Sequence, residues 1–129
     1  DQAAALELWH RRFEASPRFE TYQELRRLGG ELGTWESLRP ILLKAIDPVR
    51  QASLLLNIAL DEGDIAWALE IASNPEALLT PEALIRVANE RRAEGDTGAA
   101  RHLLYLVLEG GDADQRRVAR NILADLDQD

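Results

Sequence analysis

Glycine and proline punctuate this chain at intervals of about thirty residues, and this spacing restricts the possible folds more than any other feature. Three glycines each end an apolar run and precede a residue that can cap a helix; the pairs are Gly33-Thr34, Gly63-Asp64 and Gly95-Asp96. Three prolines follow Ser, Asp or Thr at separations of 31 and 33 residues; they are Pro17, Pro48 and Pro81. Glycine commonly follows the end of a helix, and proline is tolerated at its first position. A period in the low thirties that contains two helices is typical of an α-solenoid.

The sequence between these signals favours helix throughout. Ala, Leu, Glu and Arg dominate, and the alternating pattern of a half-buried strand is missing. The signals predict eight helices, at 3–15, 17–31, 35–46, 48–61, 65–73, 81–94, 97–109 and 113–126. Short connections make neighbouring helices antiparallel hairpins. We therefore predict a single all-α domain over residues 1–129, a right-handed α-α superhelix of about three hairpins.

Particular apolar positions are predicted to fill these hairpins. Five places after the glycines stand Leu38, Ala68 and Ala100, which we expect to face the partner helix at close range. The three tryptophans, at positions 9, 35 and 67, are interpreted as core residues because large aromatic rings fill gaps between helices. For Trp67, a role as an anchor for a binding partner stays open as an alternative.

Composition and charge argue against several classes of function. The net charge of −8 disfavours binding to a phosphate backbone, and the basic stretch at 116–120 is interpreted as the solvated face of a terminal helix. The chain has no cysteine, so disulfides and thiolate metal sites are excluded. It also lacks the run of about 20 apolar residues that a membrane span needs. We expect a cytoplasmic protein, and we expect this chain, which lacks an initiator Met, to be a segment of a longer one.

Side chains that could perform catalysis or hold a metal do not converge in this sequence. His10 has Glu7 and Glu14 within one helical turn, a pattern that favours an ion-paired surface over a metal site. His102 is expected to be partly buried beside Tyr105. The glycine clusters "LGGELG" and "EGGD" lack the strand–loop–helix setting of a phosphate cradle, and the two Glu-Gly-Asp turns supply too few oxygens for calcium. We expect no enzymatic activity, no cofactor and no metal.

Several stretches resemble known helical repeats. "LGTWESL" at 32–38, "EGDIAWALEIA" at 62–72 and "EGDTGAARHLL" at 94–104 resemble the turns of tetratricopeptide repeats. "FETYQELRRLGGELGTWESLRPILL" at 19–43 and "LLLNIALDEGDIAWALEIA" at 54–72 are similar to the helical region downstream of the zinc finger in bacterial SWIM-type proteins. The finger itself needs cysteines that this chain lacks. This resemblance implies that any metal or nucleic-acid role lies outside the chain.

Alignment on the glycines suggests a row of polar residues on the first helix of each hairpin. Six places before the glycines stand Arg27, Asn57 and Asn89, a position that faces the concave groove in tetratricopeptide-like units. Ten places before them, Gln23 and Ser53 form a possible second row. Amide and guanidinium groups can hold a peptide's backbone and carboxylates.

Two functions follow from this row and from the resemblance. The first is a scaffold that binds a protein or peptide segment in the groove. The second is an accessory structural or dimerisation domain of a zinc-finger protein whose finger lies elsewhere. A purely structural role of the asparagines, satisfying groups between hairpins, stays open.

Overall fold

The computed structural model describes residues 1–128, and all regular secondary structure in that range is helical. The helices are α1 (Gln2–Ala15), α2 (Phe19–Leu32), α3 (Trp35–Lys44), α4 (Ala52–Asp61), α5 (Ile65–Ser73), α6 (Pro81–Ala93), α7 (Thr97–Gly110) and α8 (Ala113–Gln128). Their number and order are as predicted, and the boundaries lie within two residues of the predicted ones except at the start of α4. No helix within residues 1–128 combines the length and hydropathy that crossing a bilayer requires.

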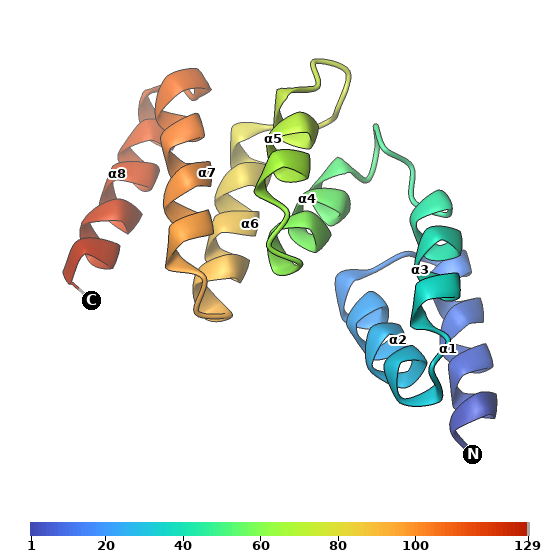
Figure 1. The fold of residues 1–129 in the computed structure, drawn as a ribbon. Helices are drawn as coiled ribbons and strands as arrows, with labels where there is room; N and C mark the ends of the chain where they lie inside the picture. Colours follow the sequence, from blue (N-terminus) through green and yellow to red (C-terminus); the bar gives the residue numbers. More distant parts are fainter. Residues whose placement is uncertain (129) are drawn as a thin grey trace.

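The helices contact one another in two patterns. Consecutive helices pack together in the pairs α1–α2, α2–α3, α4–α5, α6–α7 and α7–α8. Contacts between non-consecutive helices join α1 to α3, α2 to α4, α4 to α6 and α6 to α8. Figure 1 shows α1, α2 and α3 on one side of the molecule and α4 to α8 on the other, with the two termini at opposite ends. Helix α4 therefore connects the two sides.

The three predicted glycine turns are confirmed and share one geometry. Gly33, Gly63 and Gly95 have φ values of 73°, 75° and 85°, in the left-handed region that favours glycine. In each turn the N–H of the following residue donates to the carbonyl five residues earlier, at 2.8 or 2.9 Å. This bond satisfies a carbonyl that the helix end would leave free. The carboxylates of Asp64 and Asp96 then cap α5 and α7 by accepting a backbone N–H, as predicted.

Two of the three predicted proline starts are wrong. Ser16 does not cap α2, which begins only at Phe19 with Arg18 at its N-cap, and the serine forms the C-cap of α1 instead. Asp47 caps a turn by accepting two backbone N–H groups, and α4 begins only at Ala52. The third start is confirmed, since the Thr80 hydroxyl accepts a backbone N–H in the first turn of α6.

Small and apolar residues allow the helices to approach closely at the predicted positions. Ala68 and Ala100 are 4% and 0% exposed, and Leu38 is 8% exposed. All three belong to one connected hydrophobic core, and the three tryptophans are half-buried against it. The tryptophans are thus core residues, as predicted.

Candidate functional site

A groove runs along the face on which α2, α4 and α6 lie next to one another. It consists of two adjoining hollows of about 210 and 200 Å³ that share residues of all three helices. The lining is mostly polar, with Phe19, Glu20 and Gln23 on α2, Ser53 and Asn57 on α4, and Arg86, Glu90 and Arg91 on α6. We call this surface the α2–α4–α6 groove.

Two polar side chains form the buried floor of the groove. Asn57 is 3% exposed and donates from Nδ2 to Glu90 at 2.6 Å, while its Oδ1 has no hydrogen-bond partner within residues 1–128. Arg91 is 2% exposed and donates from Nη1 to Asp61 at 3.2 Å, but its Nε and Nη2 have no such partner in the same range. Buried polar atoms are almost always hydrogen-bonded. The described part of the chain therefore leaves one acceptor and two donors beneath the groove without a hydrogen bond, and these atoms are themselves buried.

The two hollows differ in charge. Arg18 and Arg86 line one of them, Glu94 and the buried Arg91 line the other, and Glu20 and Glu90 line both. A bound chain would therefore meet arginines towards one end and mainly carboxylates towards the other. Such an arrangement can fix the direction in which a peptide lies.

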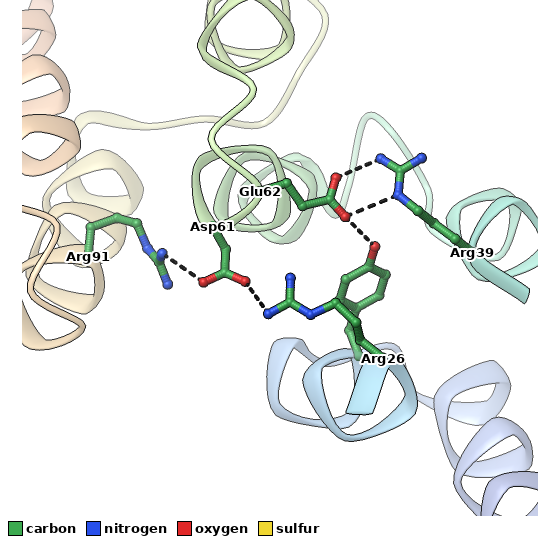
Figure 2. A network of polar contacts seen from close by, with 6 residues as sticks. Arg26, Arg39, Asp61, Glu62 and Arg91 are labelled. Atoms are coloured by element: carbon green, nitrogen blue, oxygen red, sulfur yellow. Dashed lines mark hydrogen bonds and ion pairs between the residues drawn. The ribbon is translucent and has the colours of Figure 1, made fainter. Parts of the chain in front are cut away.

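A network of charged side chains adjoins the groove at the C-terminal end of α4, and Figure 2 shows it from close by. Asp61 lies between two arginines, with Arg26 of α2 at 2.8 Å and Arg91 of α6 at 3.2 Å. Glu62 accepts hydrogen bonds from Arg39 of α3 at 2.6 and 3.0 Å. Carboxylates at a helix C-terminus are unfavourable, because that end carries partial negative charge, and the three arginines offset this cost. We call these residues, together with Tyr22, the Asp61–Glu62 network.

The network also holds the hydroxyl of Tyr22, a core residue of α2 that is 0% exposed. Its Oη donates to Glu62 at 2.8 Å. Burial raises the pKa of Tyr22, and the hydrogen bond to Glu62 raises it further, so the phenol stays protonated. Burial alone would raise the pKa of Glu62, but hydrogen bonds from Arg39 and Tyr22 outweigh it and hold that pKa below its usual range. The network thus joins α2, α3, α4 and α6 through the adjacent carboxyl groups of Asp61 and Glu62.

The structure brings together three of the five residues that the sequence suggested for a binding row. Gln23, Ser53 and Asn57 line the groove. Arg27 is exposed and pairs with two glutamates of its own helix, and Asn89 is exposed outside the two hollows. We therefore revise the candidate row to Gln23, Ser53 and Asn57, with residues of α6 that the glycine alignment did not select.

The glycine alignment selected the wrong residue of α6 because of the register between α4 and α6. Asn57 donates to Glu90, which lies 33 residues further along the chain, and Ser53 shares its hollow with Arg86 at the same separation. The glycines of these hairpins are 32 residues apart, whereas Pro48 and Pro81 are 33 apart. Alignment on the prolines would have selected Arg86 and Glu90 instead of Asn89. A shift of one residue turns a helical side chain by about 100°.

Sequence reasoning missed the Asp61–Glu62 network, although one signal was present. Asp61 and Glu62 end an apolar helix, where the helix dipole disfavours two acidic residues unless cations lie nearby. The sequence could not identify the cations, because Arg26, Arg39 and Arg91 come from three other helices.

The two histidines lie on different helices, His10 on α1 and His102 on α7. His10 Nε2 lies 2.9 Å from a carboxylate oxygen of Glu14, one helical turn away, so the predicted contact between these two side chains is present. His102 is exposed, so its predicted partial burial is wrong; it is one of the residues that line a hollow between α4, α5 and α7. Among residues 1–128 there is no group of three or more side chains that could hold a metal ion.

No protein-family model, curated protein or solved structure matches this chain. The resemblances to tetratricopeptide repeats and to SWIM-type proteins therefore stay hypotheses. Any functional conclusion has to be drawn from the geometry of the chain itself.

Proposed function

We propose that this chain is a non-catalytic helical-repeat scaffold that binds a protein segment in the α2–α4–α6 groove. The observation that carries the proposal is the groove floor, where Asn57 Oδ1 and two nitrogens of Arg91 are buried without a partner in the described chain. Every residue of an extended peptide other than proline offers one N–H and one C=O. A peptide backbone can therefore donate to the asparagine and accept from the arginine, which neutral apolar ligands cannot do.

The proposal also covers how the hairpins are arranged. The contacts of α2 with α4, of α4 with α6 and of α6 with α8 are those expected if the first helices of successive hairpins stack in a right-handed superhelix. In such a stack the first helices line the concave face. The groove would then be that face, and its length would allow an extended segment to contact all three hairpins.

Selection from a random-peptide library displayed on phage, with the full chain as the target, tests this function. The affinity of the selected peptide is measured by fluorescence anisotropy for two double variants. Gln23→Ala with Ser53→Ala, on the groove wall, is expected to weaken binding by at least about tenfold, or ~1.4 kcal/mol. Arg27→Ala with Asn89→Ala is the matched control and is expected to change the affinity by less than about twofold.

The opposite pattern, in which only the Arg27 and Asn89 variant loses affinity, would contradict binding in this groove. Failure to select any peptide would contradict the scaffold function itself. Circular dichroism of both variants checks that their helices and melting temperatures are retained.

A further inference from the structure

One of the two hollows of the α2–α4–α6 groove, with a volume of about 200 Å³, is rich in carboxylates. Glu20 of α2, Glu90 of α6 and Glu94 at the C-cap of α6 all line it, and all three residues are exposed. Glu90 accepts a hydrogen bond from Asn57, whereas Glu20 and Glu94 form no ion pair within residues 1–128. We call this surface, defined by the three glutamates, the carboxylate hollow.

The carboxylate hollow has an excess of negative charge. Arg91 is its one cationic lining residue within residues 1–128, and it is 2% exposed with Nη1 3.2 Å from Asp61. The guanidinium carbon of Arg91 lies 5.3 Å from the centre of the Phe19 ring. Arg18 and Arg86 line the neighbouring hollow and not this one. Three carboxylates therefore face one buried guanidinium, which Asp61 already opposes.

A buried acceptor adjoins these carboxylates and is an independent sign of a ligand. Asn57 lines the carboxylate hollow and is 3% exposed, and its Oδ1 has no hydrogen-bond partner within residues 1–128. Its Nδ2 donates to Glu90 at 2.6 Å, so the oxygen is the atom left over. An amide oxygen beside carboxylates, all of which accept hydrogen bonds, matches a donor that carries positive charge. Side-chain rotations, which are common when partners bind, can uncover the oxygen.

The size and the wall of the carboxylate hollow suit an organic cation. An apolar cavity of about 150 Å³ can admit a benzene ring, so a hollow of about 200 Å³ has room for the end of a long side chain. Phe19 contributes an aromatic ring to the wall, and Gln23 contributes a second amide. The methylene stem of Lys or Arg can cover an apolar surface while its charged end stays among polar groups.

We propose that the carboxylate hollow binds a Lys or Arg side chain of the protein segment held in the α2–α4–α6 groove. The ammonium or guanidinium group lies among the three glutamates and donates to Asn57 Oδ1, while its stem packs on Phe19. A cation relieves the repulsion between like charges in the hollow, which a neutral or acidic side chain does not. This proposal rests on the proposed function, and it specifies the partner as a segment with a basic residue.

The test uses the peptide selected on the full chain by phage display. Each Lys of the peptide is replaced in turn by norleucine and each Arg by citrulline, which removes the charge and keeps the carbon chain. Fluorescence anisotropy then measures the affinity of each modified peptide. We expect one replacement to weaken binding by at least about tenfold. Binding of the unmodified peptide should also weaken as salt increases, because salt screens the contact.

Glu20→Gln combined with Glu94→Gln neutralises two carboxylates of the hollow and is expected to weaken the unmodified peptide by at least about tenfold. The peptide without its critical charge should bind this variant and the wild type within about twofold, because both changes remove the same contact. Glu36→Gln combined with Glu109→Gln is the matched control. Both of these glutamates are exposed outside the two hollows, and the change in net charge is the same, so the affinity should change by less than about twofold.

A selected peptide without Lys or Arg would overturn this proposal while leaving binding in the groove intact. A peptide that keeps its affinity after every basic residue is neutralised would do the same. So would additive losses when the Glu20 and Glu94 variant meets the neutralised peptide, because the charge would then bind elsewhere. Failure to select any peptide contradicts the scaffold function itself, and with it this inference. Circular dichroism of both variants checks that the helices are retained.

Discussion

Replacing Asp61 by alanine is expected to lower the free energy of unfolding by about 3–5 kcal/mol, the usual cost of leaving a buried charge without its partner. The cost arises at Arg91, which is 2% exposed and whose only hydrogen bond within the described residues is to Asp61. Arg26 contributes less, because its side chain is 37% exposed and water can hydrate the guanidinium. Urea denaturation of the variant and the wild type measures the difference.

Two further variants test whether the loss of stability comes from the buried pair of Asp61 and Arg91. Asp114→Ala removes an aspartate whose side chain is 84% exposed and paired with Arg117, and its effect should stay within about 0.5 kcal/mol. Asp61→Leu combined with Arg91→Met replaces both charges by apolar side chains and should restore most of the lost stability. A loss below about 1 kcal/mol for Asp61→Ala would show that Arg91 reaches water without its partner.

Replacing Asn57 by leucine is expected to weaken peptide binding while leaving the stability of the fold nearly unchanged. The change removes the buried Oδ1 that has no partner in the described chain, but also the hydrogen bond from Nδ2 to Glu90, whose exposed carboxylate water can hydrate; the free energy of unfolding should therefore stay within about 1 kcal/mol of wild type. The affinity for a peptide selected on the groove should fall by at least about tenfold, because the floor loses its acceptor. Denaturation and anisotropy on the same samples measure the two quantities.

Asn89→Leu is the matched control, since Asn89 is exposed on α6 outside the two hollows and should change neither quantity. The sequence left open a purely structural role for Asn57, and that alternative predicts the opposite result. If the asparagine mainly specifies the stacking of α4 on α6, Asn57→Leu would destabilise the chain by about 1–3 kcal/mol and leave peptide affinity unchanged.

The local parts of the fold could be predicted because their causes are local in the sequence. Gly33, Gly63 and Gly95 each end a helix through the same left-handed turn, and the aspartates after two of them cap the next helix. The same local reasoning failed at Ser16. A capping residue followed by a proline predicts a helix start at this place, but in the structure Ser16 forms the C-cap of the preceding helix, α1.

The candidate site could be predicted only in part, because it depends on register between helices. Gln23, Ser53 and Asn57 were identified from a spacing of glycines, whereas the partners on α6 follow a spacing that is one residue longer. The Asp61–Glu62 network depends on contacts across 23 to 40 residues of sequence. The hollow between α4, α5 and α7 is lined by side chains of three helices, an arrangement that no short motif encodes.

The central claim is that the α2–α4–α6 groove binds a protein segment, and its most direct test is the ¹H–¹⁵N NMR spectrum of the full chain titrated with the selected peptide. We predict that the largest chemical-shift changes fall on the amides of residues that line the groove, which include Phe19, Glu20, Gln23, Ser53, Asn57, Arg86 and Glu90. Amides of α1 and α8 should shift little. Shifts concentrated on other helices, or spread evenly over the chain, would contradict the claim.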